Sequence, residues 1–584
     1  MANQPATFLI NGTDTIGRFK VSRPVASLLL GAVAIMAFGV LAHHALLTPE
    51  GFQTRDHVDF YLRVGQYARE VADHHWPQTL PDALRGGGHA FPLYYPPLAP
   101  WAALGVHALG LDIIQASHAA ALLSVALSGL FEFLLLRQLT GSIGAALLGA
   151  ACYLVFPYRY QLLQGRGSFA EGWLLAWLPA VVLATTLRGR ARTLWLPVSI
   201  SLLVLSHTAL AGWVLPLVTL LLWRAEVTSR LGLAAVGTFV GGTLVAVGIA
   251  MFYLLPVRLG LAGINASDAV LMWTTPGSVA AGEQLFSGSA HPALLASLAS
   301  LASLAIAASL LRHARPEVAA RRWAAAALIS LLVCTAVLAA PVPPWRLAPA
   351  LLRYIQSPIR LLGPMAFLIA TITGLWASVA LAGRPGRVAV LVLVLLGAGW
   401  VWGGGSRKEG VPLAELARLP HTTYSDLGFT LVGEYLPRGA DPARLAARIE
   451  ATRRQAGRPP LTAWRSVPPR FEARVDAPRG TPVPLPLVAY AFHEVRRVDG
   501  RSIDVTLAEG QLVVIAPGGP VDLIVRRRLS PGMLPGLAIS LGTLCLLLWS
   551  VRGRGSRGTR RLGRTPGPPL KNVVASSPSD HGSA

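Results

Sequence analysis

The chain has 584 residues, of which 53% are hydrophobic and only 14% are charged. Its mean hydropathy is +0.52 and its formal net charge is +23. Soluble domains carry about a quarter charged residues, and the chain has only three cysteines, so a soluble enzyme, a disordered chain and a disulfide scaffold are excluded. A polytopic membrane protein accounts for both the high hydrophobic fraction and the large positive net charge, because its apolar residues face lipid while its cations gather at the water-facing ends. The cations are spread over many short segments, which favours topology over nucleic-acid binding as their explanation.

Apolar runs long enough to cross a bilayer recur along the chain. A crossing helix needs about 20 mostly apolar residues. The first run, 25–47, follows Arg18, Lys20 and Arg23, and we expect a retained helix rather than a cleaved signal peptide. Further runs bring the expected total to about twelve crossings. These runs are 113–136, 142–157, 169–187, 194–206, 209–223, 231–255, 291–311, 323–341, 361–382, 388–403 and 532–551.

The charges of the connecting loops predict the orientation of these crossings. Arginines cluster in three predicted loops, 188–192, 312–322 and 384–387, and again in the tail. The positive-inside rule places all of them, and both termini, in the cytoplasm. With both termini on the same side, the number of crossings must be even. Segment 94–110, which begins with tyrosines and prolines, is then expected to be an interfacial or re-entrant helix and not a further crossing. We therefore expect a multi-pass protein of the cell (inner or plasma) membrane.

This topology divides the chain into five parts. We expect a cytoplasmic N-terminus (1–24), a transmembrane domain (25–403) with a large first external loop (48–112), an extracytoplasmic segment (404–530), a last transmembrane helix (531–551) and a disordered basic cytoplasmic tail (552–584). Period-two alternation within the extracytoplasmic segment predicts a small β-sandwich-like domain. Its expected strands are 471–475, 502–507, 511–515 and 521–525, with turns at Asp499-Gly500 and Pro517-Gly518-Gly519.

The first external loop contains the main catalytic candidate, Asp56. Phe60, Val64 and Tyr67 recur at helical spacing, which predicts an amphipathic helix over 58–72 on the bilayer surface. Asp56 lies at the start of this helix, where a carboxylate can cap backbone N–H groups. The alternative is a carboxylate at the membrane face that acts as a general base or metal ligand. Asp59, in the same loop, is an accessory candidate.

Several arginines on the expected external face have no topological explanation. They can extend their charged groups to the interface or pair with Glu171, but a guanidinium also matches the geometry of phosphate oxygens. We therefore predict that an anionic partner binds at the outer leaflet. The side chains concerned are Arg159, Arg166, Arg346, Arg353 and Arg360.

Two more polar residues each have a structural and a functional interpretation. His207 lies at the tight connection between two short spans, either as a hydrogen-bonded structural residue or as an accessory site residue near the outer face. Glu132 lies within a predicted span, and an intramembrane acid is a functional candidate by default. Its position close to the cytoplasmic end favours an ion pair with Arg137.

Six motifs occur in an order that resembles a known group of proteins. The run D-H-V-D-F-Y-L-R, with W-P-Q-T-L-P and R-G-G-G-H-A-F-P-L-Y-Y-P-P-L, resembles the first external loop of bacterial GT-C-type membrane proteins. The most similar group is the 6-pyruvoyl-tetrahydropterin synthase-related membrane proteins. Other counterparts are F-P-Y-R-Y…R-G-S-F-A-E at 156–171, S-H-T-A-L at 206–210, F-Y-L-L-P at 252–256, I-Q-S-P-I-R at 355–360 and G-E-Y-L-P at 433–437.

The resemblance, which covers roughly residues 25–440, implies a GT-C-like helical fold and sugar transfer from a polyprenyl-phosphate donor at the external face. It assigns the catalytic acid of the first loop to Asp56. It also makes Arg159, Arg166 and Arg360 candidates for contacts with the lipid phosphate, with Glu171 positioning one of them. The histidines of the group's G-H-D and F-H patterns are missing here, and a divalent cation, Mg²⁺ or Mn²⁺, would find only Asp56 as a ligand.

Three functions are compatible with these observations. The favoured one is a membrane glycosyltransferase that transfers a polyprenyl-phosphate-linked sugar to an envelope glycan or glycolipid acceptor. Such a protein is embedded in the lipid bilayer, and we expect no nucleic-acid partner. The second is a transporter or flippase for an anionic lipid, which would use the same arginines but needs a polar path through the bundle. The third is a non-catalytic envelope assembly protein that binds partners through the β-rich segment.

Overall fold

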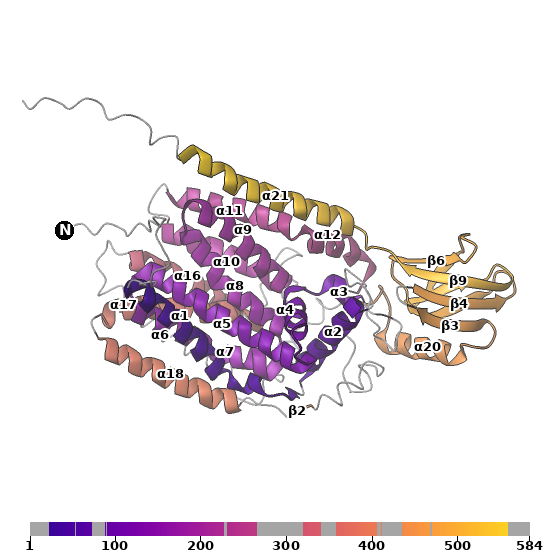
Figure 1. Cartoon of the computed structure of the whole chain (residues 1–584), viewed down its shortest axis with the longest axis horizontal. Coiled ribbons are helices and arrows are strands. Elements are labelled where there is room, and N and C mark those ends of the chain that lie inside the picture. The colour runs from indigo at the N-terminus through magenta and orange to yellow at the C-terminus, as the bar shows by residue number, and fades with distance from the viewer. Residues whose placement is uncertain are drawn as a thin grey trace, which may run out of the picture.

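Helices form one body of the structure, and a β-sandwich lies at its end (Figure 1). The computed structural model describes residues 23–265, 319–339, 358–411 and 435–558. Within these ranges, 53, 73–87, 89, 227–230, 383, 406–409 and 468–469 are excluded. The predicted run 291–311 and the candidates Arg346 and Arg353 lie outside the described residues.

The predicted apolar runs form helices close to the expected bounds. Their lengths follow from apolar side chains that continue through several turns, with glycine, proline or arginine at the ends. These helices are α1 (Arg23–Ala42), α5 (Ile113–Thr140), α6 (Ile143–Leu154), α8 (Phe169–Thr186), α9 (Gly189–Ser206), α10 (Thr208–Glu226), α11 (Leu231–Ile249), α16 (Ala319–Ala339), α17 (Leu362–Ala380), α18 (Pro385–Gly405) and α21 (Met533–Gly558).

Among the described residues, 5 helices are long and apolar enough to cross a membrane: α1, α5, α8, α17 and α21. Two bent pairs raise this number to as many as 7. One pair joins α6 to the segment formed by α7 (Pro157–Tyr160) and η2 (Gln161–Arg166), and the other joins α11 to α12 (Met251–Gly260). The structure thus contains a multi-pass set of apolar helices, whereas the total of twelve and the side of each terminus stay predictions.

Three sequence-based expectations about these helices are wrong in detail. The run 231–255 is not one straight span, because the chain bends by 73° between α11 and α12, where the N–H of Phe252 donates to Ser540 Oγ at 2.8 Å. The loop 188–192 is mostly helical, since α9 begins at Gly189. Residues 552–558 belong to α21 rather than to a disordered tail, because arginine propagates a helix well.

The centre of the bundle is α5, which packs against α8, α6, α1 and α4. Asp112 caps its start by accepting hydrogen bonds from the N–H groups of Ile114 and Gln115, each at 2.9 Å. Small residues allow neighbouring helices to approach. A Cβ on Gly149 of α6 would lie 3.0 Å from the Cα of Gly374 in α17, so this helix pair requires glycine.

Glu132 of α5 does not pair with Arg137. Its carboxylate is fully buried and accepts a hydrogen bond from the Thr371 hydroxyl of α17 at 3.1 Å. Five residues along an α-helix turn by roughly 140°, so Glu132 and Arg137 point in different directions. The predicted ion pair is therefore wrong, and Glu132 contributes to the contact between α5 and α17.

The described residues of segment 48–112, which is predicted to be the first external loop, include three helices between the bundle and the sandwich (Figure 1). They are α2 (Arg55–Ala72), α3 (Phe91–Tyr94) and α4 (Leu98–His107). Helix α4 has 10 residues, or about 15 Å, which is too short to cross a bilayer, in keeping with the prediction for segment 94–110. The loop is also tied to the chain after α18, because β1 (Gly51–Phe52) pairs with β2 (Gly410–Val411).

The β-rich segment is a two-sheet sandwich. One sheet has the order β3-β4-β9-β6 and the other β5-β8-β7, and apolar residues of both sheets form one core between them. All four predicted strands are present, and Gly500 and Gly518 have the positive φ angles expected of the predicted turns. The strands are β3 (Leu461–Val467), β4 (Arg470–Ala477), β5 (Pro482–Val488), β6 (His493–Arg497), β7 (Val505–Ala508), β8 (Gln511–Ile515) and β9 (Gly519–Arg527).

The sandwich is anchored to segment 48–112. The Tyr490 hydroxyl accepts from the N–H of Ala90, beside α3, and donates to the carbonyl of Tyr435. Tyr94 of α3 stacks on Tyr435 with an interplanar angle of 2°. Helix α20 (Pro442–Gln455) packs on β5 and β8 and adds apolar side chains to this junction. The position of α3 therefore depends on the β-sandwich.

Candidate active site

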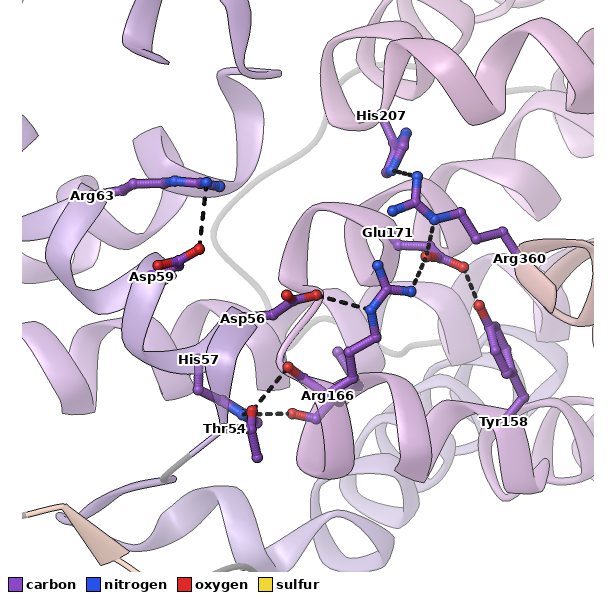
Figure 2. Close-up of polar contacts among 11 residues, drawn as sticks. Thr54, Asp56, His57, Asp59, Arg63, Tyr158, Arg166, Glu171, His207 and Arg360 are labelled. Atoms are coloured by element: carbon purple, nitrogen blue, oxygen red, sulfur yellow. Dashed lines mark hydrogen bonds and ion pairs between the residues drawn. The ribbon is translucent and has the colours of Figure 1, made fainter. Parts of the chain in front are cut away.

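Four segments distant in the sequence bring charged side chains together (Figure 2). Asp56 comes from the first turn of α2, and Arg166 from the end of η2. Glu171 comes from the first turn of α8, and Arg360 from η6 (Pro358–Leu361). We call these four residues the charged site.

Asp56 and Arg166 form the accessible part of the charged site. Arg166 Nε donates to Asp56 Oδ2 at 2.8 Å, and the two side chains are 27% and 34% exposed, respectively. Burial alone would raise the pKa of Asp56, but the positive charges of Arg166 and Arg360 outweigh burial and hold this pKa below its ordinary value. Asp56 is therefore a carboxylate that interacts with a guanidinium, and no N-cap hydrogen bond involves it among the described residues.

Glu171 lies behind Asp56 and joins the two arginines. Its Oε2 is 3.8 Å from Arg166 Nη1 and 3.7 Å from Arg360 Nε, while its Oε1 accepts from the Tyr158 hydroxyl at 2.5 Å. Glu171 is completely buried, so the cost of removing its charge from water is offset by these partners. This geometry supports the predicted positioning role and extends it to both arginines.

Arg360 is held from a second direction by His207. Arg360 Nη1 lies 3.1 Å from His207 Nε2. Burial, then the charges of Arg360 and Arg166, lower the pKa of His207 well below its ordinary value, so the imidazole is neutral. His207 thus contacts Arg360, and its accessory role stays a prediction.

His57 and Thr54 fasten α2 to the segment that carries Arg166. His57 Nε2 donates to the carbonyl of Leu163 at 2.8 Å, and Thr54 Oγ1 donates to the carbonyl of Arg166 at 2.9 Å. Gly167 makes this approach possible, because its φ is +86° and a Cβ there would lie 2.5 Å from the backbone nitrogen of His57. The distance between Asp56 and Arg166 is therefore fixed by contacts on both sides of the pair.

The charged site does not form a metal site made of protein ligands alone. Among the residues that the structure describes, no group of three His, Cys, Asp or Glu side chains could hold a metal ion. Both carboxylates already contact Arg166, so guanidinium groups supply the positive charge here. Mg²⁺ in proteins is often bound by one or two carboxylates together with substrate phosphates, so the use of a divalent cation stays a prediction.

Arg159 lies apart from the charged site, contrary to its predicted role with Arg166 and Arg360. It is completely buried, donates through Nη2 to Ser128 Oγ at 2.6 Å and lies over the ring of Tyr153 at 4.6 Å. Its guanidinium therefore faces the interior of the bundle between α5 and α6. Asp59 also lies outside the four residues, in an ion pair with Arg63 at 3.8 Å.

Several residues of the site were not identified from the sequence. Tyr158 bonds the Glu171 carboxylate, Thr54 bonds the carbonyl of Arg166, and His57 bonds the carbonyl of Leu163 in the segment that carries Arg166. Helical spacing offered one usable signal: Asp56, Asp59 and Arg63 recur at i, i+3 and i+7, which places them on one face of α2. The other contacts depend on tertiary structure and leave no pattern in the sequence.

No protein-family model and no curated protein sequence matches the chain. Solved structures do match, with probability 1.00 and low superposition scores. The arabinofuranosyltransferase AftD from Mycobacteria matches at 15% identity and a TM-score of 0.38, over 66% of this chain and 27% of the AftD chain. ArnT from Cupriavidus metallidurans in the apo state matches at 14% identity and a TM-score of 0.26, over 85% of this chain and 98% of the other.

Proposed function

We propose that the protein is a membrane glycosyltransferase that transfers a sugar from a polyprenyl-phosphate donor to a hydroxyl of an envelope glycan or glycolipid. The observation that carries this proposal is the charged site, where the partly exposed Asp56 bonds Arg166 and the buried Glu171 joins Arg166 to Arg360, on a multi-pass membrane protein. A guanidinium pair suits a phosphate leaving group, and a carboxylate suits the deprotonation of an acceptor hydroxyl.

In this reaction Asp56 takes the proton from the acceptor hydroxyl as its oxygen bonds to the anomeric carbon of the sugar. The bond between that carbon and the phosphate oxygen breaks, and its electron pair leaves with the polyprenyl phosphate. Arg166 and Arg360 stabilise the negative charge that develops on the leaving phosphate. Glu171 and His207 keep Arg360 in position before substrate arrives.

The charged site also couples donor binding to the basicity of Asp56. Asp56 and Glu171 balance Arg166 and Arg360 in formal charge, so a bound phosphate competes with Asp56 for Arg166. A phosphate beside Asp56 adds a like charge and weakens the hydrogen bond that lowers its pKa. The donor therefore raises the pKa of Asp56 and makes this carboxylate a stronger base when it is needed.

Substitution of Asp56 by asparagine tests the proposal. Asp56→Asn keeps the size of the side chain and removes the base, so transfer falls by roughly 10² or more. The assay uses purified protein in nanodiscs with labelled farnesyl-phosphate-linked pentoses and hexoses and a panel of octyl glycosides.

Asp112→Asn is the matched control for this substitution. It introduces the same chemical change at an N-cap where asparagine serves as well as aspartate, so transfer should be unchanged. Undiminished transfer by Asp56→Asn, or no transfer by the wild type with any donor, would contradict the proposal.

A second candidate, translocation of an anionic lipid, has one observation in its favour. Arg159 and Glu132 are charged-type residues buried among α5, α6 and α17, and a translocation path needs polar groups inside the bundle. Transport of a fluorescent polyprenyl phosphate across liposomes that persists in Asp56→Asn but is lost in Glu132→Gln would favour this alternative.

A further inference from the structure

A second polar group lies on the other side of Asp56 from Arg166 and Arg360. Figure 2 shows Asp59 and Arg63 on this opposite side, with Asp56 between the two groups. Arg63 is on α2, two turns after Asp56, and forms an ion pair with Asp59 at 3.8 Å. Asp59 and Arg63 therefore lie next to the charged site, but the binding of the donor phosphate gives them no role.

Aromatic residues of α3 and its end hold Arg63 in place. The guanidinium carbon of Arg63 is 4.3 Å from the centre of the Tyr95 ring and 5.4 Å from that of Phe91. Such contacts orient a guanidinium and fix the tyrosine ring against it. The three residues form a rigid set, because Phe91 is buried and α3 is fastened to the β-sandwich through Tyr94.

Tyr95 is the accessible member of this group. Its side chain is half-buried, whereas Asp59 and Arg63 are only 5% and 9% exposed. Burial raises the pKa of its phenol, and the charges that act on this phenol include Arg63, Asp56, Arg360 and Arg166. Tyr95 is therefore a neutral, partly accessible hydrogen-bonding residue whose ring lies against Arg63.

The geometry of the transfer reaction indicates what binds on the side of Asp56 where Asp59 and Arg63 lie. In a displacement, the acceptor oxygen approaches the anomeric carbon from the face opposite the leaving phosphate. The phosphate lies with Arg166 and Arg360, so the acceptor lies beyond Asp56. Side chains with hydroxyl, guanidinium or carboxylate groups, such as Tyr95, Arg63 and Asp59, can bind the hydroxyl groups of a sugar through directional hydrogen bonds.

We propose that Tyr95 and Arg63 form the acceptor-binding subsite and contact hydroxyl groups of a glycan, while Asp59 positions Arg63. This inference rests on the proposed function, since it uses the place of the donor phosphate. In the transfer step, the acceptor hydroxyl held here loses its proton to Asp56 and bonds to the anomeric carbon. The leaving polyprenyl phosphate keeps the electron pair of the broken bond.

Tyr95→Phe tests the subsite with two probes. The first is farnesyl phosphate alone, which reports the donor side by isothermal titration. The second is an octyl glycoside acceptor, whose KM is measured in the transfer assay. Loss of one hydrogen bond to the acceptor raises this KM by about tenfold, while the Kd of farnesyl phosphate is unchanged.

Tyr94→Phe is the matched control, because it makes the same change one residue earlier, on a ring that contacts Tyr435 of the sandwich junction. It should leave the acceptor KM unchanged. Asp59→Asn should raise the acceptor KM through loss of the ion pair to Arg63, and Asp59→Glu should restore it. These effects separate acceptor binding from general damage, which would lower kcat and farnesyl phosphate affinity as well.

The failure of this inference is distinguishable from failure of the proposed function. A wild-type protein that transfers sugar, but whose acceptor KM is the same in Tyr95→Phe and Tyr94→Phe, overturns the subsite alone. A weaker affinity of Tyr95→Phe for farnesyl phosphate would also overturn it, by placing Tyr95 on the donor side. A wild type that neither transfers sugar nor binds farnesyl phosphate overturns the proposed function and the subsite with it.

Discussion

Arg159 and Arg166 belong to the same bent segment but have opposite environments. Seven residues are about two turns of an α-helix, so both arginines would share one face if the segment were regular. Residues 161–166 instead form one turn of π-helix, which is wider and changes the direction of the side chains that follow. Arg159 is buried against Ser128 and Tyr153, whereas Arg166 reaches the partly exposed Asp56.

This difference shows that residue type and sequence proximity do not identify a phosphate ligand. A fully buried arginine contributes mainly to packing and internal hydrogen bonds, and its removal is felt in stability. An arginine shared between carboxylates at an accessible site can exchange a partner for substrate. The two regions should therefore respond to substitution in different measurements.

Alanine substitutions in the two regions should give the largest contrast. Arg360→Ala removes one of two guanidinium groups from the charged site, so its affinity for farnesyl phosphate falls roughly 100-fold, in line with loss of a charge-assisted contact. Arg159→Ala leaves a cavity in the bundle and costs on the order of 3 kcal/mol of unfolding free energy. Isothermal titration and unfolding by SDS in micelles measure the two effects.

Each variant serves as the control for the other. Arg159→Ala should bind farnesyl phosphate with the wild-type Kd at a temperature where it remains folded. Arg360→Ala also leaves the buried Glu171 carboxylate without this partner, so its SDS midpoint should fall as well, and the Kd of farnesyl phosphate is the measurement that separates the two variants. A loss of phosphate affinity that is as large in Arg159→Ala as in Arg360→Ala would remove the distinction between the two regions.

A substitution at Gly167 sharpens the comparison, because it disturbs only the contact between Arg166 and α2. Gly167→Ala introduces a Cβ that would meet His57 and a backbone of φ +86°, which an L side chain rarely adopts. We expect sugar transfer to fall about tenfold through displacement of Arg166 from Asp56. Gly165→Ala is the control, since a Cβ there meets nothing closer than 3.7 Å. Equal transfer rates of the two variants would show that this contact does not set the geometry of the site.

The smallest expected effect is a shift in pH dependence. The pKa of Asp56 is held below its ordinary value, so the carboxylate and its contribution to stability persist above that value and disappear as the pH falls through the lowered pKa. At donor concentrations well below KM, where the pKa of the donor-free protein governs the profile, wild-type transfer should thus be flat over about pH 5 to 7, without an inflection from His207. Arg166→Gln removes an opposing charge and should move the acid limb upward by about one pH unit. An unchanged acid limb would exclude Arg166 as the partner that sets this pKa.

The sequence predicted the apolar helices and the strands of the sandwich well, because both depend on local periodicity. It also selected Asp56 by its place in the first loop, Arg166 and Arg360 by their positive charge on the face predicted to be external, and Glu171 as a partner for an arginine; the functional roles of these four residues stay predictions. It could not separate Arg159 from Arg166, since the π-helical turn between them has no clear sequence pattern. Tyr158 and His57 were missed because their contacts join segments that only the fold brings together.

A structure of the protein with bound farnesyl phosphate would test the central claim most directly. The phosphate should lie between Arg166 and Arg360, within hydrogen-bonding distance of both, with Asp56 beside the position of the anomeric carbon and Arg159 still bonded to Ser128. A phosphate bound beside Arg159, or at a position in contact with neither Arg166 nor Arg360, would contradict the assignment of the charged site as the donor-binding centre.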